Sequence, residues 1–497
     1  MIELTPPIDE RSDEPIYVQL YRYIRQELTE GRIAAGTRLP SVRRLSGRLG
    51  ISRTPVALAY EQLQAEGYVR SVPRSGLFTE ELLPESRPRI QAGDGTKGLS
   101  GGSRLLGRNG EHNDLLNNGT SAKAGPLHQL FIDFGYGAVD WSRFPAGAWR
   151  KQLNRCLQPD DGRLFRYGDP AGEPELREEI ASYLHRTRGV RCHPSSIVIG
   201  AGTYQSLDLI LQLIGEGGAT MHVAAEEAVN DGVKRLFDRH RAVVTPIKLD
   251  SDGLRTDELN DTPHVHAVYV TPSHQFPVGM TLSAPKRLKL LQWAASSGTY
   301  IIENDYDGEY RYAGRPIPAL QAMDDNGCVA YIGTFSRALT PSFRLSYAVL
   351  PPSLLERFHA NRHSYDQLSS PLLQQAMAFF MESGGFGKHM RAMRSLYQRK
   401  RDALLQALRE SLPADGMVRI VGESSGLHLL LTWEGKEEEA MITAAEEKGV
   451  RVYPVSRYWL RGEDAPNGTV LLGFGGLTER QIQAGVSRLT EAWLGMP

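Results

Sequence analysis

The chain has 497 residues, which is more than a single hydrophobic core usually supports, so two or more domains are expected. Hydrophobic residues make up 41% of the chain and charged residues 23%, a composition typical of a soluble globular protein. The formal net charge of −1 excludes a protein that is basic throughout.

Neither a membrane anchor nor a targeting segment is expected. No run of about 18 apolar residues occurs, and the first residues are acidic and polar, so we predict a cytoplasmic protein without a membrane partner. The three cysteines, Cys156, Cys192 and Cys328, lack metal-ligand spacing and cannot pair completely. We therefore expect reduced packing residues and no metal site.

Positive charge is concentrated near the amino end of the chain. Between Arg32 and Arg74 there are eight arginines and two acidic residues, a local balance of +6. A compact basic stretch within a nearly neutral chain indicates a module that binds a polyanion and is joined to something else.

Three helices and a hairpin are predicted around this stretch. Apolar residues recur every four positions over 15–30, and Ser41 is placed to cap a second helix. The predicted elements are helices over 15–30, 41–49 and 53–66, the inner face Val56, Ala59, Tyr60 and Leu63 of the third helix, and a hairpin over 68–78 that turns at 73–76.

This order of elements is that of a winged helix-turn-helix DNA-binding domain. The first turn of the third helix would enter the major groove and bring Arg53 and Thr54 to base edges. Arg43 and Arg74 would lie beside phosphates or a groove edge. The alternative is that the arginines form the solvated surface of a small packing module. The coincidence of charge, helix order and hairpin favours DNA binding.

The same region resembles the GntR family of transcription regulators. The motifs that carry the resemblance are PIYVQL at 15–20, GTRLPSVRRL at 36–45, SRTPV at 52–56, AYEQL at 59–63 and EGYV at 66–69. The resemblance implies that double-stranded DNA is contacted by Arg43, Ser52, Arg53, Thr54 and Gly76.

A flexible linker is predicted over 81–128, between a DNA-binding domain at 1–80 and a second domain at 129–497. This stretch is rich in Gly, Ser, Asn and Arg and has too few apolar residues for a core. Its charges could instead mark a site for a partner.

Residues 129–497 alternate short apolar runs with helical stretches, which is the pattern of an α/β domain with a mostly parallel sheet. Strands are predicted at 197–199, 267–270, 300–302 and 329–332. From about residue 418 to the end, further strands near 428–431 and 470–474 predict a small carboxy-terminal subdomain.

Four motifs in this second domain resemble the pyridoxal-phosphate-dependent aminotransferases of fold type I. They are YGDPAG at 167–172 with Leu176 and Arg177, TPSHQFP at 271–277 with Gly279, IIENDYD at 301–307, and GTFSRAL at 333–339 with Pro341 and Arg344. The whole chain is similar to the MocR subfamily of GntR regulators. This resemblance implies a homodimer on paired DNA half-sites, a small-molecule effector and a pyridoxal 5'-phosphate site.

The cofactor site departs from the family at several positions. Arg337 stands where the family has the lysine of the Schiff base, and a guanidinium that stays protonated cannot act as an amine nucleophile. Asn304 stands in place of the aspartate whose charge keeps the pyridine nitrogen protonated. Asn230 replaces a tyrosine near the ring, and Leu471 aligns loosely with an arginine that clamps the substrate carboxylate.

The part of the site that binds phosphate is kept. Gly202 and Thr203 follow a strand and open a helix whose first N–H groups and positive end suit an anion. Such a turn is often only a tight turn, but Arg344 in register favours anion binding. Other residues that the resemblance places here are Ser336 in the phosphate cup, Tyr306 facing the ring oxygen, Arg337 as added charge, and His274 with Gln275, which either line the pocket or belong to the core.

We hypothesise a DNA-binding transcription regulator with an inactive aminotransferase-like domain. Its pocket would bind pyridoxal 5'-phosphate without a covalent link, or another phosphorylated or anionic metabolite. In one alternative the pocket binds nothing and the domain serves only for dimerisation. In another the chain is a working aminotransferase with a DNA-binding appendage, which would require a different lysine, such as Lys248 or Lys286, to reach the ring.

Overall fold

A computed structural model describes residues 4–82 and 131–496, except for positions 5, 10, 11, 13, 73, 74, 159–161, 217, 219, 263, 313–316, 414 and 415. The predicted linker at 81–128 lies almost wholly outside the described residues, and so does Arg74. Among the helices that are described, none combines the length and the hydropathy that a membrane span requires.

The amino-terminal domain contains the three helices and the hairpin that the sequence predicts. Its elements are α1 (Ile16–Thr29), α2 (Val42–Leu49), α3 (Arg53–Ala65), β1 (Val69–Val72) and β2 (Gly76–Thr79). The Ser41 side chain accepts a hydrogen bond from the Arg44 amide at 3.3 Å and so caps α2, and Gly50 ends α2 in the left-handed conformation. The inner faces of α1 and α3 form one apolar core, in which Leu20, Ile24 and Leu63 are fully buried.

A seven-stranded sheet forms the centre of the second domain, in the order β4-β12-β11-β10-β9-β5-β6. Strand β12 is antiparallel to β11 and β4, and the other pairs are parallel. Its strands are β4 (Ile197–Gly200), β5 (His222–Glu226), β6 (Val243–Ile247), β9 (Ala267–Val270), β10 (Tyr300–Asp305), β11 (Val329–Thr334) and β12 (Ser346–Val349). The four predicted strand segments fall within β4, β9, β10 and β11, and the mostly parallel sheet is confirmed.

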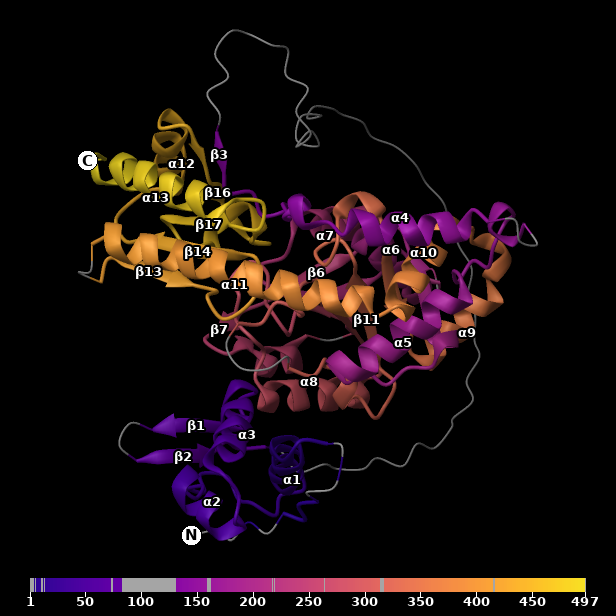
Figure 1. Cartoon of the computed structure of the whole chain (residues 1–497), viewed down its shortest axis with the longest axis horizontal. Helices are drawn as coiled ribbons and strands as arrows, with labels where there is room; N and C mark the ends of the chain where they lie inside the picture. The colour runs from indigo at the N-terminus through magenta and orange to yellow at the C-terminus, as the bar shows by residue number, and fades with distance from the viewer. Residues whose placement is uncertain are drawn as a thin grey trace.

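Helices pack against this sheet, which explains why its strands are continuous apolar runs. Helix α6 packs on β4, β11 and β12, and α8 packs on β10. The helices are α4 (Ala146–Cys156), α5 (Pro174–Arg188), α6 (Thr203–Gly215), α7 (Asp231–Arg239), α8 (Ala284–Ser297), α9 (Pro352–Ala360), α10 (Pro371–Glu382) and α11 (Gly385–Ser411). The long α11 runs from this layer into the carboxy-terminal part of the molecule (Figure 1).

The carboxy-terminal subdomain is an antiparallel sheet covered by two helices, in the strand order β13-β14-β17-β16. Its elements are β13 (Val418–Val421), β14 (His428–Trp433), α12 (Glu438–Glu447), β15 (Val450–Arg451), β16 (Tyr453–Pro454), β17 (Thr469–Gly473) and α13 (Glu479–Leu494). Strand β3 (Ile132–Asp133), from the start of the domain, pairs with β15. The remaining strands, β7 (Leu249–Asp250) and β8 (Gly253–Leu254), form a short hairpin.

The amino-terminal domain lies against α8 of the second domain (Figure 1). The Ala284 amide donates a hydrogen bond to the Glu66 carbonyl oxygen at 2.8 Å, and Ala284 is 2% exposed within the apolar core of the amino-terminal domain. The two domains are therefore in direct contact as well as being joined along the chain.

Candidate functional site

The residues predicted to bind DNA lie around the turn between α2 and α3. Arg43, Ser52, Arg53 and Thr54 are all exposed. Ser52 occupies the N-cap position of α3, but its side chain makes no capping hydrogen bond. The Ser52 hydroxyl is therefore available to contact DNA at the amino-terminal end of α3, the helix that the sequence predicts to enter the major groove.

The hairpin places Gly76 at the start of β2. Gly76 is exposed and has φ of +109°, and a Cβ there would lie 3.3 Å from the Arg38 Nε atom. Arg38 pairs with Phe78 in an isolated bridge, so an additional exposed arginine stands beside the hairpin. Its position depends on this pairing, which sequence reasoning did not include.

A cavity of about 480 Å³ lies beside the ends of several strands of the seven-stranded sheet. Glu226 ends β5, Thr271 follows β9, Asn304 belongs to β10 and Thr334 ends β11, and all four line the cavity. The cavity thus lies at the carboxyl ends of parallel strands, where α/β proteins usually bind their ligands.

Seven of the ten predicted pocket residues line this cavity, and Gly202, His274 and the buried Gln275 do not. Thr203, Asn230, Asn304, Tyr306, Ser336, Arg337 and Arg344 are the lining residues. Gly202 packs against Arg344, where any side chain would collide with the guanidinium. His274 contacts the Tyr306 hydroxyl from outside the cavity.

One end of the cavity is suited to an anion. Thr203 and Tyr204 form the first turn of α6, where backbone N–H groups lack partners within the helix. The amides of Ala201 and Gly202 are already used, since they donate to Gln205 Oε1 at 3.1 Å and to Ser346 Oγ at 2.9 Å. The N–H groups left for a ligand are therefore those at the start of the helix itself.

Arg344 extends the same end of the cavity. Its backbone is left-handed, with φ of 49° and ψ of 47°, which is uncommon for a residue with a side chain and is found often at functional sites. Its guanidinium packs against Gly202 beside the start of α6. This arrangement brings a fixed positive charge next to the free amides of Thr203 and Tyr204.

Arg337 lies in the cavity wall beside Tyr136. It is 9% exposed, donates a hydrogen bond to the Tyr136 carbonyl oxygen at 2.6 Å, and lies 4.1 Å from the centre of the Tyr136 ring. Burial by itself would lower the pKa of Arg337, but Tyr136 and Asp307 raise it above its usual value. The side chain therefore stays cationic, and no lysine occurs among the described residues that line the cavity.

Asn304 and Asn230 have different surroundings. The Asn304 amide donates to the Tyr269 hydroxyl at 2.7 Å, and its buried Oδ1 atom has no hydrogen-bond partner among the described residues. Asn230 instead caps α7, because its Oδ1 accepts from the Gly232 amide at 3.0 Å and from the Tyr204 hydroxyl. An orphaned acceptor at Asn304 can receive a hydrogen bond from a donor on a ligand ring.

Positive charge predominates in the cavity. Two lining residues are acidic: Asp231 pairs with Arg457, and burial raises the pKa of Glu226 to about 7 although Thr271 and Gln275 donate to it. The lining arginines are Arg235, Arg337, Arg344 and Arg457. A concave surface of this charge attracts anions.

Sequence reasoning missed Arg235 and Arg457. Arg235 lies in the second turn of α7, the helix that Asn230 caps. Because Asn230 is predicted to lie near the cofactor ring, a helix predicted to begin there would have indicated that Arg235 is close to the cavity. Arg457 comes from the carboxy-terminal subdomain and carries no local signal. Leu471, the position aligned loosely with a substrate-binding arginine, is fully buried in β17 and is not among the lining residues.

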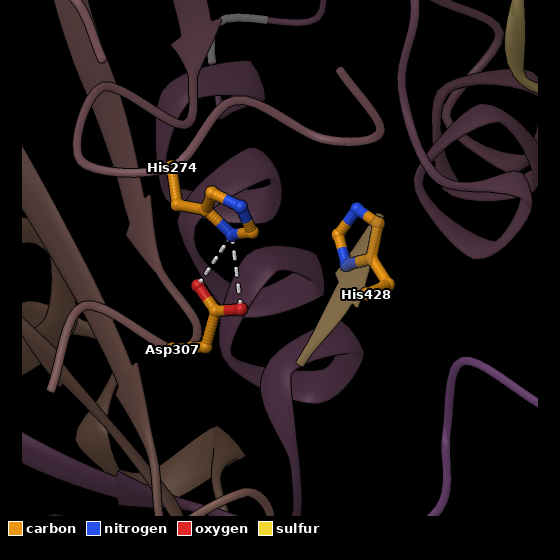
Figure 2. Close-up of side chains that lie close together, drawn as sticks. All are labelled: His274, Asp307 and His428. Atoms are coloured by element: carbon orange, nitrogen blue, oxygen red, sulfur yellow. Dashed lines mark hydrogen bonds and ion pairs between the residues drawn. The ribbon is translucent and has the colours of Figure 1, made fainter. Parts of the chain in front are cut away.

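Behind the cavity wall, His274, Asp307 and His428 form a buried cluster (Figure 2). The Nδ1 atom of His274 lies 3.0 Å from both carboxylate oxygens of Asp307 and 2.9 Å from the Tyr306 hydroxyl. Because an ionised carboxylate only accepts, Nδ1 carries the proton and donates to Asp307. The Tyr306 hydroxyl then keeps its own proton for an acceptor in the cavity.

The same three side chains are of types that bind metals, and their ligand atoms lie within 4.8 Å of one another. The Nδ1 atom of His274 is hydrogen-bonded to Asp307, whereas His274 Nε2 and His428 Nδ1 have no hydrogen-bond partner among the described residues. His428 donates through Nε2 to the Pro277 carbonyl oxygen at 2.8 Å. The contacts of His274 with Asp307 and with the Tyr306 hydroxyl hold that hydroxyl in place.

Comparison with known families divides the chain as the fold does. The family "Bacterial regulatory proteins, gntR family" matches residues 16–79, and "Aminotransferase class I and II" matches residues 131–489. The crystal structure of the multiple substrate aminotransferase from Thermococcus profundus superposes with a TM-score of 0.65 and 28% identity, over 73% of this chain and 91% of that chain.

Two relatives match along almost their whole length. The HTH-type transcriptional regulator YhdI of Bacillus subtilis (strain 168) is 41% identical over 99% of this chain and 98% of its own length. The rhizopine catabolism regulatory protein MocR of Rhizobium meliloti is 32% identical over 98% of this chain and 96% of its own. The chain therefore belongs to the MocR-like transcriptional regulators, in which a gntR-type helix-turn-helix domain precedes an aminotransferase class I and II domain.

Proposed function

We propose that the aminotransferase-like domain senses a small anionic or phosphorylated ligand without forming a covalent bond to it. The observation that carries the proposal is the lining of the cavity, which combines four arginines with no lysine among the described residues. Arg337 stays cationic at the position of the lost amine. The domain thus keeps an anion site and lacks the nucleophile that aminotransferase turnover needs.

Pyridoxal 5'-phosphate is one ligand that these residues fit. Its phosphate would lie between the first amides of α6, Ser336 and Arg344, and its ring nitrogen would meet the free Oδ1 atom of Asn304. The Tyr306 hydroxyl would donate to a ring oxygen. In an enzyme this group supplies an aldehyde for a lysine and an electron sink. Here the chain would only bind, orient and enclose it.

The DNA-binding half acts through the exposed face of α2 and α3. Arg53 and Thr54 would contact base edges, and Arg43, Ser52 and Gly76 would contact the backbone or a groove edge. Arg74, which lies outside the described residues, would join them from the turn of the hairpin. Because its target is genomic DNA, we place the regulator in the cytoplasm.

A homodimer on paired half-sites is part of the same proposal. Large apolar side chains are exposed on one stretch of the second domain: Phe165 is 66% exposed and Tyr167 fully exposed. Leu368, which is 52% exposed, follows Gln367, and Gln367 packs against Gly168. An exposed apolar patch of this kind is typical of a protein interface, and we assign it to a second copy of the chain.

Calorimetry with two ligands tests the absence of a covalent bond. Pyridoxine 5'-phosphate has the same ring and phosphate but no aldehyde, so non-covalent binding predicts similar dissociation constants for it and for pyridoxal 5'-phosphate. Borohydride treatment of the pyridoxal 5'-phosphate complex should leave no label on the protein. Binding that requires the aldehyde, together with a labelled lysine, would contradict the proposal.

The alternative of a working aminotransferase gains no support from the lysines considered for it. Neither Lys248 nor Lys286 is a lining residue, and Lys286 is held 2.8 Å from Asp252. Transamination of an amino acid with a keto acid by the purified protein would show that this alternative is correct.

A further inference from the structure

The contact between the two domains lies at the start of α8. The Ala284 amide is the first N–H of that helix, and it donates to the Glu66 carbonyl oxygen at the end of α3. The next residue, Gly67, has φ of +77°, and a Cβ there would lie 3.0 Å from the Ser283 Cβ atom. The carboxy-terminal end of α3 is therefore in direct contact with the amino-terminal end of α8.

The helix α8 depends on this contact for its cap. Ser283 is at the N-cap position but makes no side-chain cap, because its hydroxyl donates to Asp252 at 2.6 Å. The Ala284 amide would otherwise be an unpaired donor at a helix start. The DNA-binding domain thus supplies a hydrogen bond that the second domain does not provide for itself.

Glu66 and Gln62 of the amino-terminal domain and Arg287 of α8 are buried near the contact. Glu66 is 5% exposed, and its carboxylate accepts from the Tyr21 hydroxyl at 2.7 Å and from Gln62. Burial raises the pKa of the Glu66 carboxyl, and the hydrogen bonds from Tyr21 and Gln62 and the charges of Arg25 and Arg287 oppose this rise. Groups buried in this way make the docked position specific, since separation would expose or unpair them together.

A single loop connects this contact to the ligand cavity. Residues 271–283 run from the end of β9 to α8, and Thr271 and Phe276 in this loop line the cavity. Arg287 holds both ends of the loop, because it donates to the Pro272 carbonyl oxygen at 2.8 Å and to that of Leu282 at 2.8 Å. The charge of the same arginine acts on the Glu66 carboxyl across the domain contact, where it opposes the rise in pKa that burial causes.

We propose that the contact of Glu66 and Gly67 with Ser283 and Ala284 is a latch that couples occupancy of the cavity to docking of the DNA-binding domain. Ligand binding orders the loop at Thr271 and Phe276, and docking orders the same loop where it enters α8. Each event therefore lowers the entropic cost of the other. This coupling rests on the proposed function, since it requires a ligand in the cavity.

Coupling of this kind is reciprocal, so a change at the latch must alter ligand affinity. Gly67→Ala places a Cβ 3.0 Å from the Ser283 Cβ atom, so the two domains must move apart locally and the latch is weakened. Gly31→Ala is the matched control, because Gly31 has φ of +71° but nothing within 4 Å of its Cβ position. The double variant Gly67→Ala with Ser283→Gly removes the opposing Cβ and should restore docking. All are compared in the full-length protein.

The dissociation constant of pyridoxal 5'-phosphate is the first measurement. We expect Gly67→Ala to raise it at least about fivefold, Gly31→Ala to leave it unchanged, and the double variant to recover it. Hydrogen exchange of the segment around Ala284 is the second measurement. Exchange should be slowed by pyridoxal 5'-phosphate in the wild type and fast in Gly67→Ala.

The two proposals fail in different ways. If the wild type binds pyridoxal 5'-phosphate and Gly67→Ala binds it equally well while Ala284 exchanges fast, the coupling is wrong and the ligand site stands. If the wild type does not bind pyridoxal 5'-phosphate, the proposed ligand is wrong and the coupling falls with it.

A second variant covers failure of Gly67→Ala to fold. Ala284→Pro removes the donor of the latch from the other domain, and Ser283 already has the extended backbone, with ψ of 154°, that a residue before proline needs. It should raise the same dissociation constant and leave the amino-terminal domain intact. Unchanged affinity in this folded variant would overturn the latch.

Discussion

At the scale of single residues, the identity of residue 337 determines which chemistry the cavity can support. Arg337 reaches the Tyr136 carbonyl oxygen and ring, so it is held as a buried cation within the cavity wall. A guanidinium binds anions well but cannot attack an aldehyde. Arg337 therefore contributes positive charge to the cavity and no amine nucleophile.

Replacing Arg337 with lysine should return a covalent link to pyridoxal 5'-phosphate. The shorter side chain ends in an amine that the neighbouring Arg344 and Arg235 charges help to deprotonate. We expect new absorbance in the visible range and a borohydride-stable label on residue 337, found by peptide mass spectrometry. Arg235→Lys is the matched control on the same cavity, and no label is expected there. A colourless, unlabelled R337K would show that the cavity does not hold the ring as proposed.

Glu226 predicts a pH dependence of stability. Its folded pKa of about 7 lies above its unfolded value because the carboxyl is buried, so its contribution to stability is present at low pH and is lost as pH rises through about 7. From about pH 5 to about pH 7.5, the free energy of unfolding of the wild type should fall by about 2 kcal/mol relative to Glu226→Gln. Urea unfolding of both proteins measures this difference, and parallel pH curves would contradict it.

At the scale of elements, we expect the first turn of α3 and the exposed face of α2 to contact different parts of the DNA. Arg53 at the start of α3 is expected at base edges, whereas Arg43 on α2 is expected beside phosphates. Arg53→Ala should cost about 1–3 kcal/mol on the specific site and reduce discrimination between sequences. Arg43→Ala should weaken binding to all sequences alike and reduce the salt slope by about one.

Fluorescence anisotropy on specific and scrambled duplexes, from about 50 to about 200 mM salt, distinguishes these two effects. Arg22→Ala on α1, where the arginine pairs with Glu14, is the control for loss of a surface charge. Equal effects of Arg53→Ala and Arg22→Ala would mean that α3 does not read the groove.

At the scale of the whole molecule, the proposed homodimer would bring two copies of the chain to paired half-sites. Tyr167→Glu places a charge within the exposed apolar stretch and should raise the dimer dissociation constant at least about tenfold. Leu494→Glu, at an apolar position that is 55% exposed on α13, is the control. Analytical ultracentrifugation follows the dimer.

The DNA readout of the same variants is specific. Tyr167→Glu should weaken binding to DNA that carries two half-sites and leave binding to a single half-site unchanged. In a dimer, the second DNA-binding domain is held near its half-site once the first is bound, and this advantage is lost in a monomer. A Tyr167→Glu protein that stays dimeric would remove this stretch from the interface.

Much of the fold was predictable because its signals are local. The capping of α2 by Ser41, the inner face of α3 and the apolar runs of β9 and β11 depend on neighbours within a few positions. The prediction that Arg337 stands in place of the family's lysine also rests on a local motif, at 333–339. Periodicity and motifs of this kind require no knowledge of the tertiary arrangement.

The sequence alone therefore determined the two domain types, the order of their elements and the absence of an amine at residue 337. Only the tertiary structure showed that Arg457 lines the cavity. It also showed that the Gly202 amide donates to the Ser346 hydroxyl, and that the Ala284 amide, the first of α8, donates to the Glu66 carbonyl oxygen. Each of these contacts joins segments more than a hundred residues apart. Such pairings arise from packing of whole elements, which no local pattern encodes.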